Sequence, residues 1–229
     1  FYNCRKLKKL SVGTAISGIG SDEFMNDSQL EHLIIRGKDS EATGLPLILE
    51  RIAENITVSF CPDSSSSPES IVFFPEYYEW LDEISPAHIF SRSIHGEGFR
   101  MRKSFENGIL NYRKYDSCLE NALTVESPES LCKIALNRLR WPSRLEDIFR
   151  EKYENVIKKY MGTAFTLAVK DQDFPMLQFI CEHFSPDASA LASAIDQCIE
   201  KEWGEGNAFL IEAKHKSFSK KTFDFDLDF

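Results

Sequence analysis

Cysteine and histidine are the residues of this chain best suited to chemistry, as nucleophiles, general bases or metal ligands. The six cysteines and five histidines are dispersed over 229 residues, without a CxxC or HExxH motif. Cys181 and His183 are only two positions apart in a helical pattern, so they face different directions. We therefore predict a chain that is not an enzyme, with no catalytic residues, no cofactor and no metal ligands. The alternative is an enzyme whose site is assembled from distant segments and needs no local motif.

Glycines and basic residues gather in SRSIHGEGFRMRK, residues 91–103, where Gly96 and Gly98 flank Glu97. A phosphate-binding loop would need a preceding strand, a following helix, and a third glycine or a GK[ST] ending. The sequence lacks those endings, so we predict a surface loop. The net charge of −9 and the pI of about 5.2 also argue against nucleic-acid and anionic-membrane partners.

Helical patterns dominate from residue 118 onward. In ESLCKIALNRLRW the apolar positions fall on one face, and Arg138 and Arg140 are expected outside it. Ser127 and Pro128 predict the start of this helix, and Trp141-Pro142 its end. Ser143 is expected to cap a second helix. The expected apolar positions are Leu131, Ile134, Ala135 and Leu139 in the first helix, and Leu145, Ile148, Phe149, Tyr153, Val156, Ile157 and Tyr160 in the second.

The stretch TAFTLAVKDQDFPMLQFICEHF, residues 163–184, has apolar helical spacing on both sides of a polar break at residues 170–173. Pro175 follows this break directly. Proline deep inside a continuous helix costs about 3 kcal/mol, so the pattern predicts two helices joined by a tight turn.

This hairpin resembles an ankyrin repeat, because TAFTLA is similar to the family's TPLHxA opening and FPMLQFICEH to its second helix. Thr166 stands where that family has histidine, and Phe184 where it has the closing glycine. A second pair is expected at residues 190–203 and 204–216, and a looser one at 121–125 and 130–139. The resemblance implies a helical array that binds another protein.

The N-terminal part contains a repeated apolar pattern, because LKKLSV at residues 7–12 has the same spacing of apolar residues as LEHLII at residues 30–35. The strand-like run NITVSF follows at 55–60, after a predicted helix with apolar positions Leu45, Leu49 and Ile52 and an early Pro46. Residues 3–60 thus resemble a leucine-rich repeat of the kind that follows an F-box. An ordinary α/β subdomain is the alternative.

SLCKIALNRL, residues 130–139, is similar to the first helix of a SOCS box, which docks on an elongin-type adaptor through a Leu/Cys/Ile face. This likeness implies a substrate-recognition subunit of a ubiquitin ligase. Pro128 replaces the family's usual leucine, and no LPLP-like cullin segment follows. A core helix is the alternative.

Aromatic residues concentrate at 71–84, after a serine-rich segment with the composition of a linker. We expect these residues to anchor a core, and an exposed aromatic binding surface is the alternative. The tail TFDFDLDF, residues 222–229, alternates apolar and acidic residues and predicts an extended strand or a disordered end. The expected anchors are Phe73, Phe74, Tyr77, Tyr78, Trp80 and Leu81.

These patterns predict a mainly α protein with a helix-turn-helix repeat-like C-terminal half and a smaller α/β N-terminal part. The expected division is 1–60 (leucine-rich-repeat-like), 61–117 (connector), 118–216 (helical repeats) and 217–229 (tail). The dispersed cysteines suit a reducing compartment, and no run of 18 apolar residues occurs, so we expect a cytoplasmic or nuclear location. The expected function is a non-catalytic protein–protein interaction scaffold.

Overall fold

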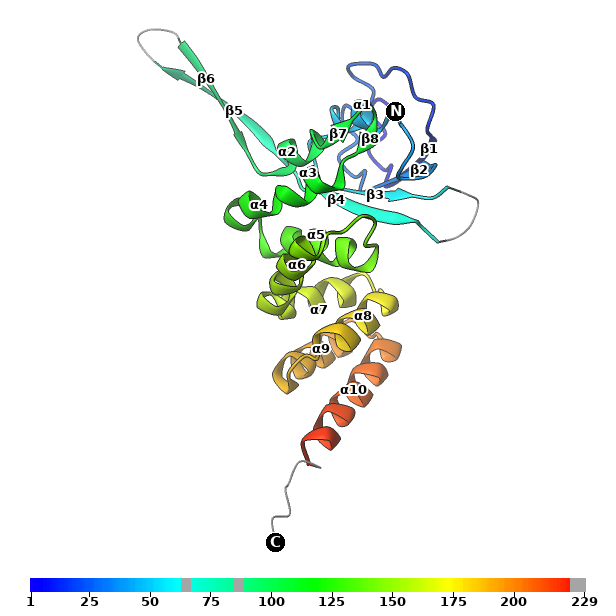
Figure 1. The fold of residues 1–229 in the computed structure, drawn as a ribbon, viewed down its shortest axis with the longest axis vertical. Coiled ribbons are helices and arrows are strands. Elements are labelled where there is room, and N and C mark those ends of the chain that lie inside the picture. Colours follow the sequence, from blue (N-terminus) through cyan, green and yellow to red (C-terminus); the bar gives the residue numbers. More distant parts are fainter. Residues whose placement is uncertain (63–66, 85–88, 223–229) are drawn as a thin grey trace. The chain divides into compact units, whose positions relative to one another are not determined.

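The computed structural model describes residues 1–62, 67–84 and 89–222 (Figure 1). Its contacts divide the chain into two compact units, Phe1–Glu151 and Lys152–Phe229, each described here by itself. The first unit holds a mixed four-stranded sheet and the second an array of packed helices, which confirms the predicted fold class. The finer division into four segments stays a prediction, and its tail lies largely outside the described residues.

The sheet of the first unit has the order β1 (Lys9–Gly13), β2 (His32–Arg36), β3 (Ile56–Phe60) and β4 (Ser70–Phe74). The first three strands are parallel, and β4 is antiparallel to β3. Helix α1 (Leu45–Leu49) lies in the connection between β2 and β3, with a proline in its first turn. The predicted order of strand, helix and strand is therefore confirmed. All three expected apolar positions of this helical segment are buried: Leu45, Leu49 and Ile52.

Short elements follow the sheet in the first unit, and the longer helix α5 packs on β4. Ser127 caps α5 by accepting a hydrogen bond from the backbone N–H of Ser130 at 3.1 Å, as predicted. Leu131, Ile134 and Leu139 are buried, which confirms the expected apolar face. The elements are α2 (Gly98–Arg102), β7 (Phe105–Glu106), β8 (Ile109–Leu110), α3 (Tyr112–Ser117), α4 (Leu119–Val125) and α5 (Pro128–Arg140).

Arg138 is fully buried, so the prediction that it lies on the outer face of α5 was wrong. Its guanidinium donates to both carboxylate oxygens of Asp116, from Nε at 2.8 Å and from Nη2 at 2.9 Å. The same group lies 4.4 Å from the ring centroid of Tyr112 and donates to the backbone carbonyl of Ser143. Helical periodicity places Arg138 beside the core but does not reveal the acid that α3 brings to it.

Asp39 is the second buried acid of this region. It accepts hydrogen bonds from the hydroxyl groups of Tyr112 and Ser143, and Arg144 forms an ion pair with it at 3.0 Å. Ser143 therefore does not cap a helix as predicted, because its hydroxyl group is used here and α6 (Asp147–Lys159) begins four residues later. Three of the seven residues expected in the apolar stripe of this helix are buried, namely Tyr153, Val156 and Ile157, whereas Ile148 is exposed.

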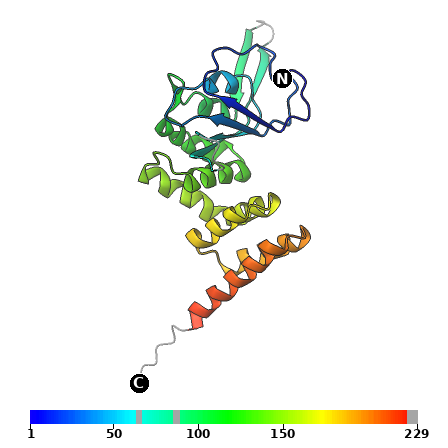
Figure 2. The same cartoon turned by 90° about the vertical axis from the view of Figure 1, so that its right-hand side faces the viewer.

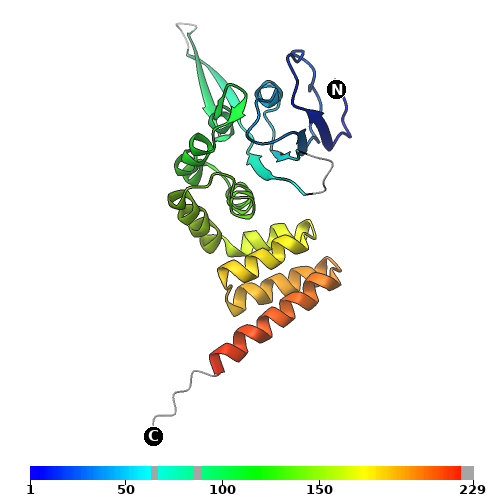
Figure 3. The same ribbon diagram turned by 45° about the vertical axis from the view of Figure 1, so that its right-hand side comes forward.

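The second unit contains two stacked helical hairpins, which Figures 2 and 3 show one below the other. The first is α7 (Met161–Lys170) with α8 (Phe174–Phe184), and the second is α9 (Ala188–Glu200) with α10 (Gly204–Thr222). α7 packs against α9, and α8 packs against α10. The prediction of two helices around a tight turn is confirmed, with Asp173 capping α8 and Pro175 in its first turn.

The two hairpins close with the same turn. Gln172 and Glu202 adopt left-handed φ values of 49° and 54°. The next residue in each turn donates its backbone N–H five residues back, from Asp173 to Ala168 and from Trp203 to Cys198, both at 2.9 Å. Ser185 takes the left-handed position after α8, where a closing glycine would be usual. The missing glycine at Phe184 therefore does not interrupt the array.

Candidate interaction site

A two-stranded antiparallel ribbon, which we call the arm, extends away from the sheet of the first unit (Figure 1). It pairs β5 (Tyr78–Ile84) with β6 (Ile89–His95). The prediction of a surface loop over residues 91–103 was therefore wrong, because this segment holds the end of β6 and helix α2. Polar residues on both faces of β6 hide its period of two, and backbone pairing with β5 needs no apolar face.

Half of the expected aromatic anchors lie on the arm and are exposed. Phe73 and Phe74 on β4 are buried, as expected, whereas the exposed fractions of Tyr78, Trp80 and Leu81 are 59%, 56% and 66%. The core interpretation was wrong for these three residues. A core forms only where a second layer covers the first, and the sequence does not show that the sheet ends at β4.

Both faces of the arm carry exposed apolar side chains beside charged groups. On one face the ring of Tyr78 stacks on His95 with centroids 4.9 Å apart, and the Trp80 indole N–H donates to Asp82 at 2.5 Å. The opposite face carries Leu81 and Ile94, which are both exposed, together with an ion pair between Arg92 and Glu79. Each face thus presents a large apolar surface bordered by charge.

A hollow of about 880 Å³ lies at the base of the arm. Its lining comes from the start of β5, the end of β6, α2, α4 and the first residues of α5. Tyr78, Ile94 and Phe99 supply apolar surface, while the carboxyl groups come from the chain before β5, before α2 and after α4. Its charged lining residues are Glu76, Glu97, Glu126 and Arg100, and its other polar residues include His95, Asn121, Thr124, Ser127 and Ser130.

Glu97 is the most buried acid of this hollow, with 5% of its side chain exposed. Its backbone N–H donates to the carboxylate of Glu126 at 2.7 Å. Its side chain hydrogen-bonds with Cys118 and Asn121, yet its Oε1 atom has no hydrogen-bond partner and lies 3.5 Å from Nε of Arg100. Burial raises the pKa of Glu97 and of Glu126 above the ordinary value, and Arg100 opposes this rise for Glu97.

The glycines around Glu97 serve backbone geometry. Gly96 has a φ of +90°, which a side chain would disfavour. A Cβ atom on Gly98 would lie 1.9 Å from the carbonyl oxygen of Pro75, so only glycine permits this approach of α2 to the end of β4. α2 spans five residues only.

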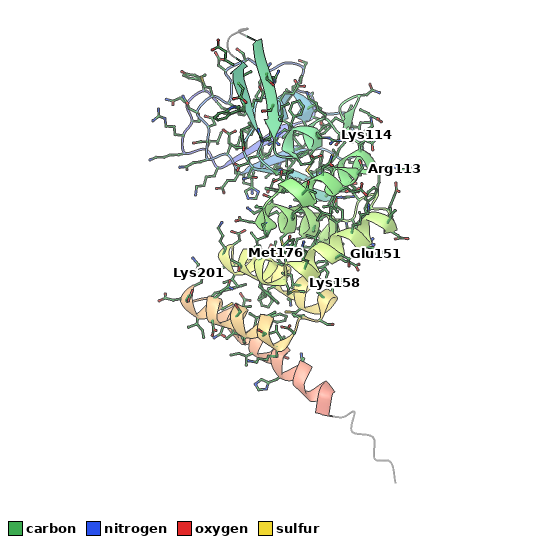
Figure 4. All side chains as sticks on the ribbon, turned by 90° about the vertical axis from the view of Figure 1, so that its left-hand side faces the viewer. Arg113, Lys114, Glu151, Lys158, Met176 and Lys201 are labelled. Carbon is green, nitrogen blue, oxygen red and sulfur yellow. The ribbon has the colours of Figure 1, made fainter. Side chains whose placement is uncertain are left out.

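The basic residues of segment 91–103 are engaged within the first unit. Arg92 pairs with Glu79, Arg100 with Glu97 and Lys103 with Glu50, while Arg102 is buried. Figure 4 shows two further basic residues on α3, Arg113 and Lys114, which pair with Glu146 and Glu106. The segment therefore provides no continuous basic face of the kind that nucleic-acid binding requires.

The thiol groups near histidine or acid are not activated. Burial raises the pKa of Cys118, beside Glu97, to about 11, and that of Cys181 to about 12. His183 contacts the carbonyl of Phe179 at 3.0 Å, and His95 contacts the hydroxyl group of Ser93. A thiol with a raised pKa stays protonated near neutral pH and is a poor nucleophile.

The SOCS-box-like face of α5 is occupied within the chain. Leu131, Cys132 and Ile134 are all buried, and α5 packs on β4. Docking of an adaptor through this face would require α5 to leave the sheet. Residues 130–139 therefore lie in a core helix, which was the alternative interpretation of this sequence.

Three comparisons, with protein-family models, with curated proteins and with solved structures, find no match to the chain. Within the described residues, no helix is both long and apolar enough to cross a membrane. The same residues contain no group of three histidine, cysteine or acidic side chains placed to hold a metal ion.

Sequence reasoning missed the hollow because its acids are up to 50 positions apart. The sequence does contain a weak indication of the arm. Residues 78–84 and 89–95 have equal length, contain aromatic and branched apolar residues, and are separated by Ser-Pro-Ala-His. That pattern is compatible with a hairpin.

Stability is expected to fall with rising pH because of two carboxyl groups, that of Glu97, which is buried, and that of Glu126, which is half-buried. Their pKa values are raised from the ordinary 4.5 in the folded chain, which therefore keeps protons that the unfolded chain has released. This contribution is complete below pH 4.5 and is lost as pH rises through the raised values. Glu97→Gln and Glu126→Gln should each make the fall shallower in urea titrations at a series of pH values. Equal slopes in the wild-type protein and in both variants would contradict this account.

Proposed function

We propose that this chain is a protein-interaction module that binds a segment of another protein through the arm and the hollow at its base. The observation that supports this proposal is the exposure of Tyr78, Trp80 and Leu81 on a two-stranded ribbon. Exposed aromatic and large apolar side chains beside a concavity mark binding surfaces more often than ordinary surface. Tyrosine and tryptophan are also enriched among the residues that dominate binding energy.

The backbone of the arm adds to this surface. A two-stranded ribbon leaves one edge of each strand without a neighbouring strand, and an extended segment can pair with such an edge. Glu79, Asp82 and Glu83 lie on β5, so a partner strand beside it would suit basic residues. Main-chain pairing would supply affinity, and the side chains of the arm would supply selectivity.

We further propose that both units are diverged repeats. The stacking of α7 on α9 and of α8 on α10, with equivalent turns, supports an ankyrin-type array. Thr166 departs from that family, because its hydroxyl group donates to the carbonyl of Gly162 at 3.0 Å. Three parallel strands support a leucine-rich-repeat origin of the sheet.

Selection from a random peptide-display library on the purified full chain tests the arm. Wild-type protein is expected to enrich a family of peptides, and Trp80→Ser with Leu81→Ser is expected to enrich none of them. Affinity of a synthetic peptide from the family should fall at least about tenfold in this variant, since central aromatic residues often contribute 2 kcal/mol or more. Isothermal titration would measure the difference.

The matched control is Ile148→Ser with Ile199→Ser, which removes two exposed apolar side chains, each 59% exposed, outside the arm. This control should enrich the same peptides as wild type. Both double variants should unfold within about 1 kcal/mol of wild type, because exposed substitutions usually cost little. Peptides that bind the arm variant as well as wild type, or a wild-type protein that enriches no family, would overturn the proposal.

A further inference from the structure

Three carboxyl groups converge on the hollow from separate elements. Glu76 precedes β5, Glu97 precedes α2 and Glu126 follows α4, and all three line the same concavity. Tyr78 and Phe99 add aromatic surface to the lining. Acids beside aromatic rings form a surface suited to a cation, since carboxylates attract it by charge and rings by their quadrupole.

The Oε1 atom of Glu97 is a buried hydrogen-bond acceptor that receives no hydrogen bond. Only 5% of the Glu97 side chain is exposed, and this oxygen has no hydrogen-bond partner. The nearest cation is Arg100, whose Nε lies 3.5 Å away and whose side chain is 63% exposed. A buried polar atom without a hydrogen bond destabilises the fold, and a donor that reaches it from the hollow would relieve that cost.

The cations near the hollow leave it net acidic. Arg100 is the cation of its lining, and the ring of His95 stacks on Tyr78. Arg102 lies behind the lining and donates only to backbone carbonyl groups in its described hydrogen bonds, namely those of Ile52, Glu54, Pro75 and Gly98. Lys103 lies over Phe99 and pairs with Glu50. The charge of the lining therefore disfavours an anion.

We infer that the hollow is a subsite for a lysine or arginine side chain of the bound segment. The cationic group donates to Oε1 of Glu97 and is held by the charge of Glu126. The aliphatic part of the side chain lies against Tyr78 and Phe99. This inference rests on the proposed function, because the bound segment is the one that the arm holds.

Nuclear magnetic resonance titration of the ¹⁵N-labelled full chain tests the subsite without any knowledge of the partner. N-acetyl-argininamide and N-acetyl-lysine methylamide are expected to shift the amide signals of Gly96 and Gly98 saturably. N-acetyl-norleucine methylamide, which has a similar chain without charge, should leave them in place. Glu97→Gln and Glu126→Gln should weaken the response at least about tenfold, as expected for loss of one member of a close charge pair. Glu31→Gln should respond as wild type.

The outcomes separate this inference from the proposed function. Absence of a saturable shift up to the solubility limit of both cationic amides overturns the subsite, as does an equal response to norleucine or an unchanged response in Glu97→Gln. Peptides selected on the arm without enrichment of lysine or arginine would leave the arm proposal standing and the subsite rejected. Circular dichroism of Glu97→Gln should match wild type, since glutamine preserves the shape of the side chain, and Glu126→Gln provides a second independent variant.

Discussion

Replacing Arg138 by alanine is expected to lower the free energy of unfolding of the first unit by about 3–5 kcal/mol. The guanidinium is fully buried and donates two hydrogen bonds to Asp116. Its loss leaves a buried carboxylate without its counter-ion, and also removes a donor from the carbonyl of Ser143. Urea unfolding of the full chain, followed by hydrogen exchange of peptides from α3 and α5, would locate the loss in this unit.

Arg140→Ala is the matched control, because Arg140 lies on the same helix and is only half-buried. It should cost less than about 1 kcal/mol. The double variant Arg138→Met with Asp116→Leu should regain much of the stability lost in Arg138→Ala, since apolar replacement of a whole buried pair is often neutral. Equal losses for Arg138→Ala and Arg140→Ala would show that the buried pair does not stabilise the unit.

Arg102→Met should lower the free energy of unfolding by about 3 kcal/mol and loosen the base of the arm. The guanidinium donates to carbonyl groups on both sides of the arm, at 2.5 Å to Pro75 and at 3.0 Å to Gly98. Burial lowers its pKa to about 10, so it remains charged at neutral pH. Methionine fills similar space without donors, so both carbonyl groups lose the hydrogen bonds that the guanidinium supplies.

Hydrogen exchange should therefore accelerate at residues 76–78 and 95–98 in Arg102→Met, in addition to the loss of global stability. Arg102→Lys should lie between wild type and Arg102→Met, because an ammonium group keeps the charge but lacks the planar fork. Lys103→Met is the neighbouring control, with a half-exposed side chain. Normal hydrogen exchange at these residues in Arg102→Met would contradict the role of Arg102 in fixing the base of the arm.

The sequence by itself determined the helices in the second half of the chain and several of their starts, although not the start of α6. Ser127, Asp173 and Pro175 act through hydrogen bonds and steric limits within a few residues, so their effects appear in a local pattern. The repeated apolar runs likewise predicted three of the four strands of the sheet, β1 to β3, and the predicted helical pairs from α7 to α10 are confirmed.

Only the tertiary structure decided which side chains meet across long stretches of sequence. Arg138 is buried because α3 supplies Asp116, and Trp80 is exposed because the sheet ends one strand earlier. Glu97 faces a hollow because α4 brings Glu126 beside it. Burial depends on which layer covers a residue, and charge on which partner approaches it. Both are set by packing between distant segments, which local periodicity does not encode.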